Sequence, residues 1–314
     1  MKIQVAELTP VELADRADAQ MNAGQIVDGL DLLVTGLWET RQSMDAEGWK
    51  NLCTYLRTEH RICEKLYQDP MTWRAFTKPR GYAGDAVMMD YLYGIHGGEE
   101  ADRQASPVGR AILRHVQTRP TSQGVIFRRR HLAELIDGQA AGGVKPGVLA
   151  IAAGHLREVE LSAALQRGAI ERFVALDADA ESLAEVAASY GHLGVETIHG
   201  SVRDLLRRKV RLGQFDFVYA AGLYDYLVDE VAQALTARMI AMAKPGGTVL
   251  IPNFAPLVEG RGYMECFMDW HLIYRDEYDM VGLLGRTDRA QIADYDVYSD
   301  PWGSVVYLRV RKAR

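Results

Sequence analysis

The sequence predicts an α/β fold in which a helical N-terminal region precedes a doubly wound parallel sheet that ends in an antiparallel hairpin. Three observations support this prediction. From Val148 onward, short apolar runs alternate with amphipathic segments, which is typical of strands and helices in turn. Residues 1–140 show apolar residues at helical spacing and no convincing strand. Near the C-terminus, two strand-like runs flank Asp300-Pro301-Trp302-Gly303, which indicates a hairpin.

Composition narrows the classes of partner. The chain has 314 residues and a net charge of −6, which disfavours a nucleic-acid partner because phosphate binding needs a basic surface. No apolar run approaches the roughly 20 residues of a membrane span, and Met1–Glu7 lacks the apolar core of a signal peptide. The three cysteines, Cys53, Cys63 and Cys266, have no metal-like spacing. We therefore expect free thiols, no metal site and a cytoplasmic protein.

The N-terminal region, residues 1–140, is expected to form a helical subdomain. An apolar stripe recurs through the segment from Gln25 to Met44, and Asp45 is the expected N-cap of a helix that continues to Leu66. Such stripes predict the core of the subdomain, and the face of a homodimer is the alternative. The basic run from Arg128 to His131 lies in a helical pattern and predicts a solvated helix face, with docking of an anionic substrate tail as the alternative.

Residues 77–85 form a loop that differs from its neighbours. Two glycines, a proline, two cations, a tyrosine and a carboxylate fall within this short stretch. Glycines allow close backbone approach, while Arg80 and Tyr82 offer hydrogen bonds to a ligand. We interpret the loop as a functional lid, and a structural connector is the alternative.

The second domain is expected over residues 141–314. The predicted strands are 148–151, 173–176, 195–199, 215–219 and 248–252, the predicted helices include 180–189 and 230–243, and the hairpin strands are 294–299 and 304–311. This alternation predicts parallel strands with helices on both faces of the sheet.

The turn after the first predicted strand is the expected cofactor site. An apolar strand, a small-residue turn and a helix start, in that order, place backbone N–H groups where a cofactor is held. A carboxylate 23 residues after Gly154 ends the second strand and can accept hydrogen bonds from both hydroxyls of a ribose. The third strand ends where an adenine edge would lie. The candidate cofactor-binding residues are Arg80, Tyr82, Ala152, Gly154, Glu158, Asp177, Ala178, Ser201, Val202 and Gly222.

Acceptor and catalytic candidates come from two other segments. After the fourth strand, one of Tyr224 and Tyr226 is expected to pack in the core and the other to line the pocket. Residues 265–278, within an insertion expected over 257–285, predict a helix on which His271 and Arg275 share one face and Trp270 and Tyr274 another. The alternative is that the aromatic residues pack on the core and the charges face water. The catalytic candidates are His271, Arg275 and Tyr226, and the substrate-binding candidates are Tyr224, Asp225, Trp270 and Tyr274.

Four motifs resemble one bacterial family. They are Lys78-Pro79-Arg80-Gly81-Tyr82-Ala83-Gly84-Asp85, Ala152-Ala153-Gly154-His155-Leu156-Arg157-Glu158, Ala221-Gly222-Leu223-Tyr224-Asp225-Tyr226-Leu227, and Tyr263-Met264-Glu265 followed by Asp269-Trp270-His271-Leu272-Ile273-Tyr274-Arg275. From about residue 70 to its end, the chain is similar to enzymes of extracellular-factor (3-hydroxypalmitic acid methyl ester) biosynthesis. The resemblance implies a Rossmann-like class I methyltransferase fold, S-adenosylmethionine as the cofactor and methylation of a fatty-acid carboxylate. Such an enzyme would serve the biosynthesis of a secondary metabolite.

The first turn departs from the common methyltransferase pattern. That pattern has an acidic residue at the position of Ala150 and glycines at Ala152 and Leu156, and only Gly154 remains here. The acid often anchors the amino group of the cofactor, so another residue must do so. The resemblance makes the alanine-rich turn a family trait.

The sequence leaves several functions open. The leading hypothesis is O-methylation of a carboxylic acid, fatty-acid-like metabolite. An alternative is N- or S-methylation of a small amino-acid-like metabolite, which would need a base or an amine clamp. A second alternative is a non-catalytic binding protein with a degenerate cofactor fold. A nicotinamide oxidoreductase is disfavoured by the C-terminal hairpin and by the Lys244-Pro245-Gly246-Gly247 turn.

Overall fold

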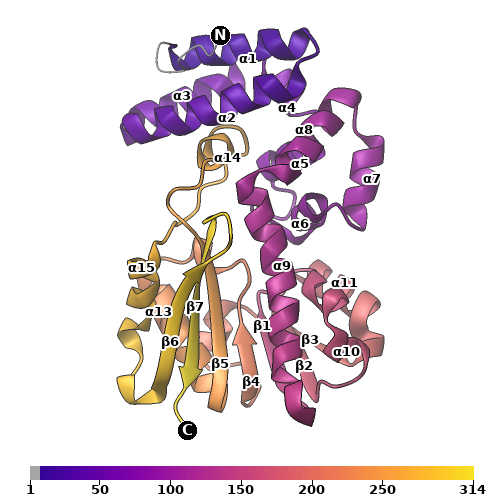
Figure 1. Cartoon of the computed structure of the whole chain (residues 1–314), viewed down its shortest axis with the longest axis vertical. Helices are drawn as coiled ribbons and strands as arrows, with labels where there is room; N and C mark the ends of the chain where they lie inside the picture. The colour runs from indigo at the N-terminus through magenta and orange to yellow at the C-terminus, as the bar shows by residue number, and fades with distance from the viewer. Residues whose placement is uncertain (1–7) are drawn as a thin grey trace. The chain divides into compact units, whose positions relative to one another are not determined.

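The computed structural model describes residues 8–314, and the contacts of the chain divide it into two compact units. The helical unit runs to Gln123 and includes Val258–His271, and the sheet unit contains Gly124–Leu257 and Leu272–Arg314 (Figure 1). The division differs from the expected boundary at residue 140 because residues 124–140 group with the sheet, and only part of 257–285 groups with the helices. The expectation about a signal peptide at Met1–Glu7 lies outside the described residues.

The helical unit is built on amphipathic helices. Its helices are α1 (Pro10–Asn22), α2 (Ile26–Ser43), α3 (Ala46–Thr58), α4 (Cys63–Leu66), α5 (Pro70–Thr77), α6 (Ala86–Tyr93), α7 (Gly97–Gln104), α8 (Pro107–Thr118) and α14 (Arg261–Phe267). The predicted stripe of α2 is buried at Leu30, Leu33, Val34 and Leu37, so it belongs to the core of this unit. The three cysteines are free and buried.

The expected helix from Asp45 to Leu66 is interrupted. The Asp45 carboxylate caps α3 as predicted, accepting a hydrogen bond from the backbone N–H of Gly48 at 2.7 Å. The helix ends at Thr58, and α4 begins only at Cys63. Between them the ring of His60 accepts the N–H of Ile62, so a side chain takes the place of an intrahelical bond.

A buried carboxylate fastens α14 inside the helical unit. Glu265 accepts hydrogen bonds of 2.7 Å from Arg41 Nε, from Trp49 Nε1 and from Arg261 Nε. Burial alone would raise the pKa of Glu265, but these bonds from Arg261 and Arg41 outweigh it, and the pKa is lowered. Glu265 is therefore a charged anchor between α14 and helices α2 and α3.

The sheet unit contains the predicted parallel strands and the predicted hairpin. Its strands are β1 (Gly147–Ile151), β2 (Arg172–Asp177), β3 (Val195–His199), β4 (Phe215–Tyr219), β5 (Ala243–Phe254), β6 (Ile292–Ser299) and β7 (Val305–Lys312). They form one sheet in the order β3-β2-β1-β4-β5-β7-β6, with β7 antiparallel to β5 and β6 (Figure 1). This confirms the predicted fold class.

The helices of the sheet unit cover its strands. They are α9 (Pro120–Gln139, from Gly124 onward in this unit), α10 (Ala163–Gln166), α11 (Ala180–Tyr190), α12 (Val202–Leu206), α13 (Asp229–Met242) and α15 (Glu277–Gly282). Helix α11 packs on β2 and β3, α13 on β4 and β5, and α15 on β6 and β7. The strand order reverses between β1 and β4, and ligands of such sheets bind outside the carboxyl ends of the strands at this reversal.

Two properties of the described residues bear on the expected partners. Within residues 8–314, no helix combines the length and the apolar character that a membrane crossing requires. Over the same range, no three histidine, cysteine, aspartate or glutamate side chains gather in a way that could hold a metal ion.

Candidate active site

The turn after β1 adopts the left-handed backbone conformation that glycine favours, although only one of the three residues in that conformation is a glycine. Ala152, Gly154 and Leu156 have φ of 51°, 55° and 54°, which is the left-handed region. A non-glycine residue pays roughly 1–2 kcal/mol there. The turn is held by the N–H of Ala153, which donates to Leu176 O at 3.2 Å, and by the buried side chain of Leu156. Such retained strain is typical of functional turns.

Asp177 is joined to this turn. It ends β2 next to the turn because β1 and β2 pair in register up to Ile151 and Leu176. One carboxylate oxygen accepts the N–H of Gly154 at 2.8 Å, and the other accepts the N–H of Asp179 at 2.8 Å. The half-buried carboxylate is thus held rigidly, as recognition of two ribose hydroxyls would require.

The end of β3 brings the next candidates to the same edge of the sheet. Ser201 caps α12, and its hydroxyl and backbone N–H both bond to the carboxylate of Asp204. Val202 is the first residue of α12. Ala178 follows Asp177 and is exposed, with its carbonyl 3.0 Å from Nε2 of His199. Contact of these residues with an adenine stays a prediction.

Glu158 lies at the point where the strand order reverses. It belongs to a short 3-10 helix, η3 (Arg157–Leu161), directly after the turn, and its side chain is buried. The hydroxyl of Tyr219 donates to Glu158 Oε1 at 2.6 Å, and Tyr219 is the register partner of Ala150 across β1 and β4. Burial raises the pKa of Glu158, while the hydrogen bond from Tyr219 and the charge of Arg128 oppose this.

Arg128 is a candidate site residue that the sequence interpretation missed. A solvated face was expected for the run from Arg128 to His131, but Arg128 on α9 is only 6% exposed. A methyl group added to Gly222, in the loop after β4, would lie 3.7 Å from Nη2 of Arg128. The signal was present in the sequence, because Arg128 shares the helical stripe of the buried residues Val125 and Leu132.

The two tyrosines of the loop after β4 differ as expected. Tyr224 is fully buried, and its hydroxyl lies 3.0 Å from Thr236 Oγ1 on α13. Tyr226 is 37% exposed. Asp225 is buried, accepts the N–H of Phe254 at 2.7 Å, and has its pKa raised to about 6 by burial.

The helix predicted over 265–278 is wrong. Helix α14 ends at Phe267 and α15 begins at Glu277. Asp269 has a left-handed φ of 47°, and the N–H groups of Ile273 and Arg275 bond to carbonyls of the loop after β4 and of β5. The four-residue spacing therefore places neither His271 with Arg275 nor Trp270 with Tyr274 on a common helix face, and residues 272–275 belong to the sheet unit.

Arg275 holds the loop after β4. It is 2% exposed and donates from all three guanidinium nitrogens. Its acceptors are Tyr224 O at 2.8 Å, Asn253 Oδ1 at 2.9 Å, Leu227 O at 2.6 Å and Asp229 Oδ1 at 2.7 Å. This arrangement favours a positioning role over direct contact with an acceptor. Tyr274, next to it, is half-buried.

The remaining candidates lie in the helical unit. Trp270 is buried, and His271 has a side chain that is 59% exposed and 3.4 Å from Asp269 Oδ1. Asp269 also pairs with Lys78 at 2.6 Å, at the start of the expected lid loop.

The end of that loop is fixed as well. Asp85 caps α6 and receives two hydrogen bonds from Arg74, at 2.9 and 2.8 Å. Between these anchors Arg80 is half-buried and Tyr82 is exposed. Their contact with a cofactor stays a prediction.

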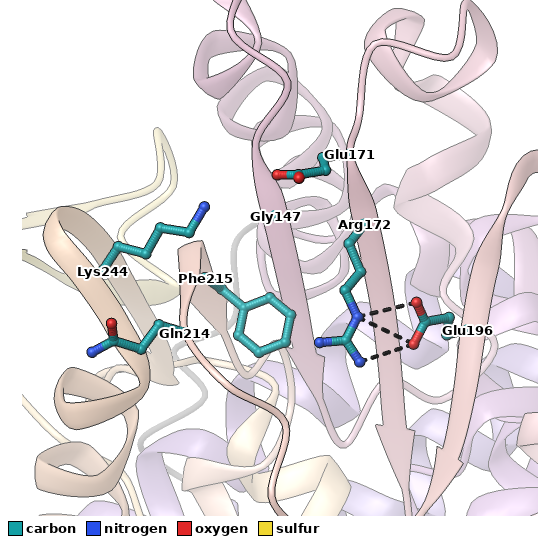
Figure 2. A pocket seen from close by; sticks show the side chains of 7 residues that line it. All are labelled: Gly147, Glu171, Arg172, Glu196, Gln214, Phe215 and Lys244. Carbon is teal, nitrogen blue, oxygen red and sulfur yellow. Dashed lines mark hydrogen bonds and ion pairs between the residues drawn. The ribbon is translucent and has the colours of Figure 1, made fainter.

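A hollow of about 440 Å³ lies at the opposite edge of the sheet. Figure 2 shows its lining residues, which are Gly147, Glu171, Arg172, Glu196, Gln214, Phe215 and Lys244. These lie at the amino ends of the parallel strands or in the loops before them, and Arg172 is paired with Glu196 at 2.9 Å. Because ligands of such sheets bind at the carboxyl edge, this hollow is not the candidate site.

Comparison with known proteins shows a methyltransferase domain and a shared fold. Residues 148–247 match a family described as a methyltransferase domain. A solved structure titled a possible exported protein from Bordetella parapertussis is similar over 90% of this chain and 96% of its own, with 13% identity and a TM-score of 0.59. The S-adenosylmethionine-dependent methyltransferase SibL, in its apo form, is similar over 84% of this chain and 78% of its own, with 15% identity and a TM-score of 0.50. At these identities the similarity shows a shared fold. No curated protein matches the sequence.

The matched domain contains the turn after β1, Asp177, Ser201 and Gly222. The strand order is that of the class I methyltransferase fold, and the matched domain supports an S-adenosylmethionine-dependent methyltransferase. The residues at the carboxyl edge fit the cofactor chemically. They offer a carboxylate for ribose hydroxyls at Asp177, close backbone approach at Gly154, and a buried guanidinium and carboxyl group at Arg128 and Glu158.

Proposed function

We propose that this S-adenosylmethionine-dependent methyltransferase transfers a methyl group to the carboxylate of a fatty-acid-like metabolite. The four motifs that resemble the hydroxypalmitic acid methyl ester enzymes suggest this acceptor. Methylation of a carboxylate requires no general base, because a carboxylate is already ionised at neutral pH. An amine, thiol or hydroxyl acceptor would have to lose a proton.

The observation that carries the proposal is that polar groups in and around the loop after β4 are engaged in hydrogen bonds within the fold. The hydroxyl of Tyr224 bonds to α13, the carboxylate of Asp225 accepts a backbone N–H, and the guanidinium of Arg275 donates to the loop. Burial also raises the pKa of the Tyr224 hydroxyl, so that it stays protonated. These groups keep the loop rigid and are poorly suited to taking a proton, which favours an acceptor that arrives ionised.

The acceleration of methyl transfer would come from the orientation of the methyl donor and the acceptor. Bound S-adenosylmethionine supplies a methyl group on a sulfonium, whose leaving group departs without protonation. Asp177 would hold the ribose hydroxyls, the turn at Gly154 would contact the nucleoside closely, and the rigid loop at Gly222 would align the acceptor. Fixed positions and exclusion of water supply most of the rate enhancement in such displacements.

One observation favours the alternative of N- or S-methylation. His271 is exposed, and the carboxylate of Asp269, 3.4 Å from its Nε2, would orient its ring. That pair would serve as a base for an amine or a thiol. The third function, a non-catalytic binding protein, rests on the changes at Ala150, Ala152 and Leu156 alone.

The acceptor is tested by product identification. The protein is incubated with methyl-labelled S-adenosylmethionine and matched sets of long-chain acids, short acids, amines and thiols, and the products are identified by mass spectrometry. We expect labelled methyl esters of the long-chain acids, with much less product from short acids. Labelled products from amines or thiols alone would replace this proposal with the alternative. Asp177→Ala is the control, because it should reduce transfer to every acceptor alike.

The cellular setting is part of the proposal. Three free, buried cysteines suit a reducing cytoplasm, and an acyl ester as product suits secondary metabolism. A small-molecule acceptor is the expected partner.

A further inference from the structure

The position of Ala150 raises a specific question about the cofactor. An ammonium group bound there needs a carboxylate acceptor, and the side chain of Ala150 supplies none. Ala150 lies in the middle of the sheet and is fully buried, with Tyr219 beside it on β4. A group that replaces the missing acid must therefore reach the same crevice from another element.

Glu158 is tied to the strand beside Ala150. It follows the turn by a few residues, and Tyr219 fixes its Oε1 at 2.6 Å. The donor of this bond, Tyr219, is the last residue of β4 and the register partner of Ala150, so the Glu158 carboxyl group is tied to the strand beside Ala150. Its side chain is 7% exposed, so a bound cation there would meet a carboxylate with little competition from water.

Arg128 brings the opposite charge to the same place. Its guanidinium lies close to Gly222 in the loop after β4, and it is buried like Glu158. Its charge acts on both Glu158 and Asp225. Burying such groups is costly, and a guanidinium and a carboxyl group kept buried at the reversal of strand order mark a candidate binding site.

We propose that Glu158 and Arg128 together hold the amino-acid end of S-adenosylmethionine, with Glu158 accepting from its ammonium group and Arg128 donating to its carboxylate. The proposal rests on the proposed function and names the residues that replace the acid absent at Ala150. Tyr219 acts as a positioning residue that orients Glu158. A free amino acid group carries one positive and one negative charge, which matches this pair.

The experiment compares two ligands that differ only in the amino-acid end. S-adenosylhomocysteine carries it, and 5′-methylthioadenosine keeps the nucleoside thioether without it. Calorimetry on the full chain should show that Arg128→Gln and Glu158→Gln each weaken S-adenosylhomocysteine binding by about 10- to 100-fold, the range for a lost charged hydrogen bond. Affinity for 5′-methylthioadenosine should change by less than about threefold. Arg130→Gln, an exposed change of the same type on α9, is the matched control and should leave both affinities unchanged.

A third ligand shows which of the two residues binds the ammonium group and which binds the carboxylate. The deamino analogue of S-adenosylhomocysteine keeps the carboxylate, so Arg128→Gln should weaken it while Glu158→Gln should not. Equal weakening of all ligands, or no weakening of S-adenosylhomocysteine, would overturn the proposal. Should Glu158→Gln fail to fold, Arg128→Gln and the comparison of the three ligands on the wild-type protein still decide. If the wild type bound neither nucleoside, the proposed function itself would fail, which is a distinct result.

Discussion

Replacing Arg275 with methionine tests whether this residue positions the loop or touches the acceptor. The change removes every donor of a buried guanidinium and leaves three neutral acceptors, at Tyr224, Asn253 and Leu227, without it. Each buried acceptor that loses its partner costs about 1–3 kcal/mol. Relaxation makes the sum less than additive, so we expect a loss of about 3–5 kcal/mol from the three unpaired acceptors.

The ion pair with Asp229 contributes little to that figure. The side chain of Asp229 is 72% exposed, and exposed pairs contribute about 0–1 kcal/mol. Asp229→Asn is therefore the matched control, with an expected change below about 1 kcal/mol.

Hydrogen exchange with mass spectrometry measures this effect locally. Peptides that cover residues 224–229 should lose protection in Arg275→Met and keep it in Asp229→Asn, while peptides of the helical unit serve as an internal reference. Urea unfolding gives the accompanying change in the free energy of unfolding. Unchanged stability and protection together with lost transferase activity would refute the positioning role and restore Arg275 as a catalytic candidate.

Three further predictions concern the turn, the anchor of α14 and the ribose site. Ala152→Gly should stabilise the fold by up to about 1 kcal/mol by removing left-handed strain, whereas Ala153→Gly should destabilise it, as urea unfolding would show; a loss in Ala152→Gly would contradict the strained turn. Glu265→Gln should cost about 3 kcal/mol because Arg41 loses a buried partner. Since the pKa of Glu265 is lowered on folding, its contribution is fully present above the unfolded pKa and lost as pH falls through the folded pKa. Thermal unfolding should thus become less sensitive to acid in Glu265→Gln, and an unchanged acid profile would count against this assignment. Asp177→Asn should weaken S-adenosylhomocysteine binding by about tenfold in calorimetry with little loss of stability; wild-type affinity would exclude the ribose role.

The sheet could be predicted because its signals are local. Five apolar runs at the spacing of β-α units and a Pro-containing turn before Val305 determine the element types, and the right-handed crossover rule restricts their arrangement. The candidate cofactor edge followed from the same reasoning, since Asp177 ends β2 and Ser201 lies two residues after β3.

The segment after β5 could not be predicted in this way. Residues 265–278 have a helical apolar pattern, yet the backbone bonds of Ile273 and Arg275 go to other elements, and Asp269 adopts a left-handed conformation. Tertiary bonds therefore override a local preference. Arg128 was misjudged because its charge was given more weight than its place on the stripe of Val125 and Leu132, and the loop at Gly222 that lies near it is distant in the sequence.

The central claim is that a methyl donor binds at the carboxyl edge of β1 and β2, in a turn with only one glycine. Isothermal titration calorimetry of the wild-type protein and of Asp177→Ala with S-adenosylhomocysteine tests it most directly. The account predicts saturable binding to the wild type and binding at least about tenfold weaker to Asp177→Ala. Absence of binding to the wild type, or equal binding to both proteins, would contradict it.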